Sequence, residues 1–175
     1  MECGVDVFES KNFNIQSVPP FNTNSLDEDQ DSQANIDAGF VLTNKYNSLK
    51  LVFLADNNLY NEDVIEKNLS LVSNPDLIAF AYSSFATDFP FNYSFSFEEK
   101  IDIINENENK RFELQCKNLK KIKPKCVMPY SSEFVAVGEH SKNWIELLPF
   151  AWTSSKNKVA DKYASFLNTQ CVDLY

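Results

Sequence analysis

The sequence predicts an α/β fold built on a mixed sheet, in which parallel strands are joined by helical crossovers. Short apolar runs at residues 49–55, 75–82 and 125–131 read as buried strands. Helical spacing of apolar residues fills the intervals at residues 61–72 and 96–123. Strand–helix–strand alternation with short links is typical of right-handed parallel β-α-β crossovers, and this alternation defines the fold class.

The amino-terminal part predicts strands of a different kind. Residues 1–20 alternate weakly between polar and apolar, which indicates one or two edge strands before Pro19 and Pro20. Residues 22–35 are polar and acidic without periodicity, so we expect an acidic surface loop. Residues 39–56 predict two strands around a turn at residues 45–48.

Two segments carry most of the helical signal. In the first, Val64, Ile65, Leu69 and Val72 lie near helical spacing, and acidic residues occupy the first turn. The second, at residues 97–123, is a long helix, and Pro124 would end it.

The start and end of the long helix are marked in the sequence. Ser96 and Glu99 fit the S-x-x-E capping box. Lysines crowd the carboxyl end, where the helix dipole favours cations; these are Lys117, Lys120, Lys121 and Lys123. The core stripe is expected to comprise Ile101, Ile104, Phe112, Leu119 and Ile122. Its periodicity fails around residues 105–109, which allows a kink or a break there.

The carboxyl-terminal part predicts a further short strand at residues 133–138 and a last helix at residues 158–168. With 175 residues and 43% hydrophobic content, residues 1–175 suit a single domain with one core.

Composition excludes several functions. Only 3 glycines argue against phosphate-cradling loops, which need glycine for positive φ. A net charge of −9 makes nucleic acids and anionic membranes unsuitable partners. No apolar run approaches the roughly 20 residues needed to cross a bilayer, and the amino-terminus lacks signal-peptide features. We therefore expect a cytoplasmic protein.

The four cysteines are Cys3, Cys116, Cys126 and Cys171. None forms a CxxC pair or a Cys/His cluster with zinc-ligand spacing. In a reducing compartment we interpret them as small buried apolar residues.

Ligands of such sheets usually lie beyond the carboxyl ends of the strands. Three segments are expected there: residues 56–58, 83–95 and 130–133. Asp56 ends the apolar strand abruptly, and two roles remain open for it. It is either a ligand in a site or a cap and turn residue that accepts backbone hydrogen bonds at a helix start.

The second of these segments is unusually aromatic. Such a loop at the strand ends can line a cleft or contact a partner, and it can equally fold back and fill the core. If it lines a ligand pocket, the expected residues are Phe85, Asp88, Phe89, Phe91, Tyr93, Tyr130 and Ser131.

No residue qualifies as catalytic by its sequence context. His140 lies in a polar segment, and no carboxylate or nucleophile is evident to orient it. Ser83, Ser84, Ser131 and Ser132 lack the GxSxG context of a serine nucleophile.

Several of these segments together resemble a known arrangement. "LVFLADNN", "FAYSSFATDFP", "FEEK" and "MPYSS" follow one another between residues 51 and 132. Across residues 36–150 this is similar to the C-terminal half of metallo-β-lactamase-fold proteins. It resembles especially the branch related to the β-lactamase-like domain of CMP-N-acetylneuraminate hydroxylase. The resemblance implies one half of an αββα sandwich, and Asp56 matches the aspartate that bridges two metals in active members.

The chain departs from that family at its diagnostic motif. The HxHxDH motif is absent, and the chain has a single histidine. The late histidine of many active relatives is replaced at Ser131 or Ser132. A catalytic zinc needs three or more convergent protein ligands. The chain should therefore hold no metal by itself. Zinc, iron or manganese would bind at Asp56 only if another polypeptide completed the site.

These observations predict a domain that is non-catalytic or incomplete on its own. It would act as a binding or scaffold module with another protein chain, which could be an N-terminal half, a second copy or a heteromeric partner. The first alternative is a metal-dependent hydrolase completed by a missing N-terminal half. The others are an acidic protein that binds a basic partner and a small-molecule binder that uses the aromatic loop.

Overall fold

The computed structural model of the protein describes residues 7–18, 39–54, 59, 62–82, 94–130 and 156–172. The predicted surface loop at 22–35, the strand at 133–138 and His140 lie outside these residues. Among the residues described, no helix has the length and apolar character that crossing a membrane requires.

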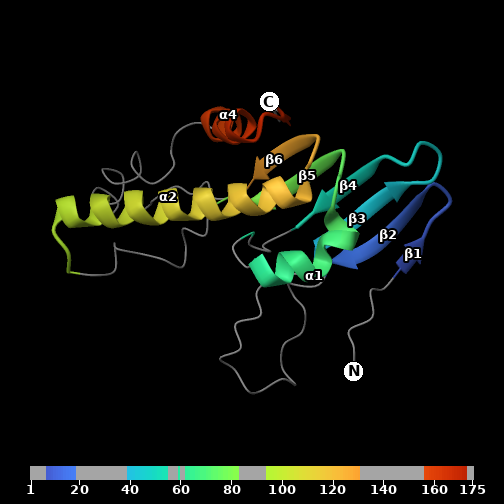
Figure 1. The fold of residues 1–175 in the computed structure, drawn as a ribbon, viewed down its shortest axis with the longest axis horizontal. Helices are drawn as coiled ribbons and strands as arrows, with labels where there is room; N and C mark the ends of the chain where they lie inside the picture. The colour runs from blue at the N-terminus through green and yellow to red at the C-terminus, as the bar shows by residue number, and fades with distance from the viewer. Residues whose placement is uncertain are drawn as a thin grey trace, which may run out of the picture.

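Among the described residues, seven strands form one sheet at the centre of the fold, and they follow one another in chain order (Figure 1). The strands are β1 (Val7–Glu9), β2 (Phe13–Val18), β3 (Gly39–Asn44), β4 (Lys50–Phe53), β5 (Leu77–Ala81), β6 (Cys126–Tyr130) and β7 (Gln170–Cys171). Neighbours from β1 to β4 are antiparallel, and those from β4 to β7 are parallel. This confirms the predicted mixed α/β sheet; the short strand β7 was not predicted.

The helices are α1 (Glu62–Val72), α2 (Phe97–Ile122) and α4 (Lys156–Leu167). The first joins β4 to β5 and the second joins β5 to β6, so both serve as parallel crossovers. In Figure 1, the carboxyl-terminal half of α2 lies across the sheet, and its amino-terminal half extends beyond it.

The predicted kink or break in α2 is wrong, because the helix is continuous through residues 105–109. Those residues are asparagines and glutamates, and they include neither proline nor glycine to interrupt the hydrogen-bond ladder.

The ends of α2 form as the sequence predicts. The Ser96 side chain accepts from the Glu99 N–H at 3.2 Å, and the Glu99 carboxylate accepts from the Ser96 N–H at 2.8 Å. The bond from the Ser96 backbone holds the pKa of Glu99 below its usual value. At the other end, Lys123 adopts the left-handed conformation with φ of 59°, and its N–H donates to the Leu119 carbonyl. Pro124 follows at once.

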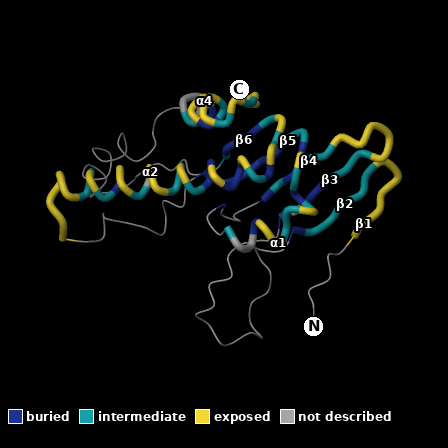
Figure 2. The backbone as a smooth tube through the Cα atoms, viewed as in Figure 1, coloured by how far each residue is buried: buried dark blue, intermediate teal, exposed yellow. Residues whose placement is uncertain are grey.

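The hydrophobic core lies on one face of the sheet. Alternate residues of the strands point to this face and are buried, as the period of two requires. The three described helices pack against them, and Figure 2 shows the buried residues of the central strands in dark blue. The strand members are Val18, Val41, Val52, Leu54, Ile78, Phe80 and Val127, and the helix members include Ile65, Val72, Ile104, Leu119, Ile122 and Tyr163.

The opposite face of the sheet carries none of the described helices, and we call it the helix-free face. The residues of this face that pair across neighbouring strands are nevertheless mostly apolar. Phe40 stacks on Phe53 with ring centroids 4.8 Å apart, and Phe40 remains 40% exposed. Its polar residues are Ser17 and Asn44, and its other residues are Phe8, Phe13, Ile15, Phe40, Leu42, Leu51, Phe53, Leu77, Ala79, Ala81, Cys126, Met128 and Tyr130.

One carboxylate joins the amino ends of three parallel strands. Asp76, just before β5, accepts from the Lys50 N–H of β4 at 2.7 Å. Its other oxygen accepts from the Lys125 ammonium, just before β6, at 2.7 Å. The Lys125 hydrogen bond is the main cause that lowers the pKa of Asp76.

Candidate site at the carboxyl ends of the parallel strands

The three central parallel strands end together at one edge of the sheet. Leu54 follows β4, Tyr82 follows β5 and Tyr130 ends β6. The Tyr82 N–H donates to the Tyr130 carbonyl at 3.3 Å, which holds these two strand ends together. In open α/β sheets, ligands usually bind beyond the carboxyl ends of the parallel strands, which is this edge.

Of the predicted site residues, Tyr130 lies in the described part of the chain. It is half-buried and occupies the helix-free face at the end of β6. The others are outside the described residues: Asp56, Phe85, Asp88, Phe89, Phe91, Tyr93 and Ser131. A pocket role for this group and a ligand role for Asp56 therefore stay predictions.

A fully buried glutamine on α2 holds the end of β5. The Gln115 amide nitrogen donates to the Ala81 carbonyl at 3.1 Å, and its amide oxygen accepts from the Tyr163 hydroxyl. The Tyr163 ring packs edge-on against Phe80, with centroids 5.2 Å apart. One side chain thus links α2, β5 and α4 directly below the strand ends.

A second buried amide, Asn118, holds the segment between β4 and α1. Its nitrogen donates to the Leu59 carbonyl at 2.7 Å. Leu59 is fully buried and lies three positions after Asp56. The Asn118 oxygen is buried, and no hydrogen-bond partner is found for it within the described structure.

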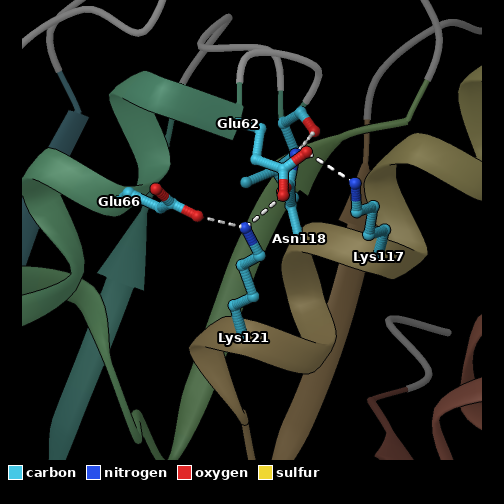
Figure 3. A network of polar contacts seen from close by, with 6 residues as sticks. Glu62, Glu66, Lys117, Asn118 and Lys121 are labelled. Atoms are coloured by element: carbon cyan, nitrogen blue, oxygen red, sulfur yellow. Dashed lines mark hydrogen bonds and ion pairs between the residues drawn. The ribbon is translucent and has the colours of Figure 1, made fainter.

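Two lysines of α2 and two glutamates of α1 join the helices beside Asn118 (Figure 3). Lys117 pairs with Glu62 at 2.6 Å, and Lys121 pairs with Glu62 and, at 2.6 Å, with Glu66. The hydrogen bonds that Lys117 and Lys121 donate lower the pKa of Glu62 to about 2. The bond that Lys121 donates to Glu62 is also the main cause that raises the pKa of Lys121.

The sequence analysis predicted no role for Gln115 and Asn118, although it predicted the lysines at the carboxyl end of α2. A signal was present for Gln115. It falls at i+3 between Phe112 and Leu119 on the predicted core stripe. A polar residue at a core position must have partners, since leaving it unpaired costs free energy.

The described residues do not fit a metal centre. They contain no group of three or more histidine, cysteine, aspartate or glutamate side chains that could hold an ion. Burial raises the pKa of the Cys116 thiol to about 11, which disfavours the thiolate that ligates metals. Burial likewise raises the pKa of Cys126. We therefore derive no catalytic step through a metal from these residues.

The mixed sheet, with its helices on one face and its strand ends held from α2, defines an α/β fold that matches metallo-β-lactamase-fold proteins. No protein family matches the chain by sequence, and none of the curated proteins matches it.

Solved structures of similar fold include two of one enzyme. CmlA, a diiron β-hydroxylase from Streptomyces venezuelae, superposes with a TM-score of 0.52 and 12% identity, over 98% of this chain and 32% of CmlA. A mutant of the same β-hydroxylase gives a TM-score of 0.51 and 10% identity, over 97% of this chain and 31% of that one. The chain spans about a third of the length of these structures, and identities this low show the fold alone.

Proposed function

We propose that the chain is a binding or scaffold module of the metallo-β-lactamase-fold type, which works together with a second polypeptide. The single observation that carries this proposal is the helix-free face. An apolar sheet face is stable in water when another layer covers it, because burial of apolar surface is the main driving force of folding and association.

The exposed part of this face lies over the antiparallel strands. Phe8 on β1 is 72% exposed and Phe40 on β3 is 40% exposed, while Ala79 and Ala81 on the parallel strand β5 are already buried. The face carries no charged residue across β2 to β6. A contiguous apolar patch without charge is typical of a protein–protein contact.

The test is co-purification of the tagged chain from its native host, with stoichiometry measured by native mass spectrometry. We expect a fixed-stoichiometry complex in which amide hydrogen exchange slows in β3 and β4. A double substitution, Phe40→Lys with Leu42→Lys, should remove the partner. The matched control is Tyr46→Lys, because Tyr46 is 74% exposed in the turn after β3 and lies off the face.

A chain that purifies as a folded monomer and turns over a substrate alone would contradict the proposal. So would a complex that survives the double substitution, because the partner would then be held by another surface.

A second candidate is a metal-dependent hydrolase completed by another polypeptide. The observation in its favour is that the solved structure of similar fold is a diiron enzyme, of which this chain spans about a third. Metal analysis of the purified complex separates the two functions. Zinc, iron or manganese at stoichiometric level, lost on Asp56→Asn, would favour the hydrolase, and a metal-free complex would favour the scaffold.

A further inference from the structure

Within the described part of the chain, no strand pairs with the outer hydrogen-bonding side of the edge strand β1. It is the first strand of the sheet, and among the described residues only β2 pairs with it. Its residues are Val7, Phe8 and Glu9, of which Val7 is 54% exposed and Phe8 is 72% exposed. Natural sheets usually protect such edges with charges, prolines or bulges, because an exposed edge pairs with other chains.

The register fixes which backbone groups face outward. In the hairpin between β1 and β2, the Ser10 N–H donates to the Phe13 carbonyl at 2.8 Å. Opposite residues in an antiparallel ladder alternate between hydrogen-bonded and non-hydrogen-bonded pairs. The Phe8–Ile15 pair lies two positions from the hydrogen-bonded Ser10–Phe13 pair, so it is hydrogen-bonded as well. Phe8 therefore bonds to β2, and Val7 and Glu9 direct their N–H and C=O groups away from it.

This arrangement is complementary to itself. If two copies of β1 pair antiparallel about a two-fold axis at Phe8, Val7 of each copy lies opposite Glu9 of the other. The outward groups of these residues then form four backbone hydrogen bonds. The two Phe8 side chains meet as a non-hydrogen-bonded pair, in which cross-strand contact is closest.

The charge at the edge does not oppose this pairing. The one charged residue of β1 is Glu9, and the Lys45 ammonium of the same copy lies 3.1 Å from its carboxylate. Two edges of a chain with net charge −9 can approach each other here because the local acid is neutralised in each copy.

We propose that β1 is a strand-pairing site for a second copy of this chain. The pairing joins the two sheets edge to edge and makes their helix-free faces continuous through Phe8. It differs from the contact proposed above because it uses the backbone of the sheet edge; the two share Phe8, and the helix-free face over β3 and β4 stays available.

Sedimentation equilibrium of the full chain and its variants tests the proposal. Wild type should dimerise. Val7→Pro removes one outward donor per copy and leaves the bonds to β2 in place, so the dimer should weaken about tenfold. Phe8→Lys should weaken it further, since two ammonium groups would meet at the axis. Tyr46→Lys is the matched control and should have no effect.

Two results would overturn the proposal. One is a wild-type chain that stays monomeric up to roughly 1 mM, the limit of weak association. The other is a dimer that Phe40→Lys breaks and Val7→Pro does not, because the contact would then lie on the helix-free face. Circular dichroism of each variant checks that it is folded.

Cross-linking gives a second, independent measurement. In a Cys3→Ser background, Phe8→Cys should form an intermolecular disulfide under mild oxidation, because non-hydrogen-bonded partners lie about 4.5 Å apart at Cα, within disulfide range. The control Glu9→Cys faces Val7 of the other copy and should stay uncrosslinked. Equal cross-linking at both positions would contradict the register.

Discussion

Gln115 and Asn118 show how single amides position the strand ends. An amide both donates and accepts, so Gln115 can bond to Ala81 on β5 and to Tyr163 on α4 at the same time. Both amides are almost completely buried. Removing one leaves its partners in a dry environment, where an unmade hydrogen bond is costly.

We predict that Gln115→Leu destabilises the fold by roughly 2–4 kcal/mol, since two buried hydrogen bonds disappear while the volume is nearly kept. Urea unfolding measures the change. The exposed neighbour Glu113 provides the control, and Glu113→Leu should stay within about 0.5 kcal/mol of wild type. If the two variants prove equally stable, the Gln115 contacts contribute little.

Glu62 should make stability depend on pH in the acidic range. Its pKa falls from 4.5 to about 2 in the folded chain, because Lys117 and Lys121 hold its charged form. A folded-state pKa below the unfolded one stabilises the fold above pH 4.5, and the contribution is lost as the pH falls towards 2.

The measurement is the difference in urea midpoint between wild type and Glu62→Gln, followed from pH 7 to pH 2. The difference should be constant down to about pH 5 and then shrink. A difference that keeps its full size at pH 2 would contradict the ion pairs. High salt should reduce it at neutral pH, because both partners are solvent-accessible.

At the scale of elements, the carboxyl-terminal half of α2 joins several parts of the fold. It packs on the core, bonds to the end of β5, holds the segment before α1 and contacts α4. Its carboxyl end carries strain, because Lys123 adopts a left-handed conformation that a side chain disfavours.

We predict that Lys123→Gly stabilises the chain by about 0.5–1 kcal/mol, since glycine adopts this conformation without the steric penalty. The same substitution inside the helix is the control. Lys110→Gly, at an exposed position of α2, should cost about 1 kcal/mol. Thermal unfolding of both variants gives the comparison, and opposite signs are the expected result.

The elements were largely predictable because local signals agreed with the tertiary structure. Each of these signals depends on only a few neighbouring residues. They are the capping box of Ser96 and Glu99, the helix end before Pro124, and the apolar runs of β4, β5 and β6. The two-residue strand β7 could not be found this way. It forms by pairing with β6, a contact between distant residues that has no local pattern.

The candidate site was predictable only by its location at the strand ends. The hydrogen bond from Asn118 to Leu59 joins residues 59 positions apart, and neither residue type indicates the other. The predicted pocket residues that follow β4 and β5 lie outside the described residues, so a pocket there stays a prediction.

At the scale of the whole molecule, the two faces of the sheet have different environments. One face is covered by the three helices and forms the core, and the helix-free face remains partly exposed. Neighbouring residues of β3 therefore have opposite environments: Val41 is 1% exposed and Phe40 is 40% exposed.

Lysine substitutions at these neighbours test which face is the core. Val41→Lys buries a charge among apolar side chains and should prevent folding, whereas Phe40→Lys should leave the chain folded and cost about 1–2 kcal/mol through the lost stack on Phe53. Circular dichroism and urea unfolding of both variants are sufficient. A reversed order of stability would mean that the register of β3 is shifted by one residue.

The carboxylate of Asp76 has a consequence for how this fold can diversify. Because it links the beginnings of three strands, their relative register does not depend on the contacts at their carboxyl ends alone. The chain that follows those ends can therefore change in length or chemistry while Asp76 still keeps the strand beginnings together.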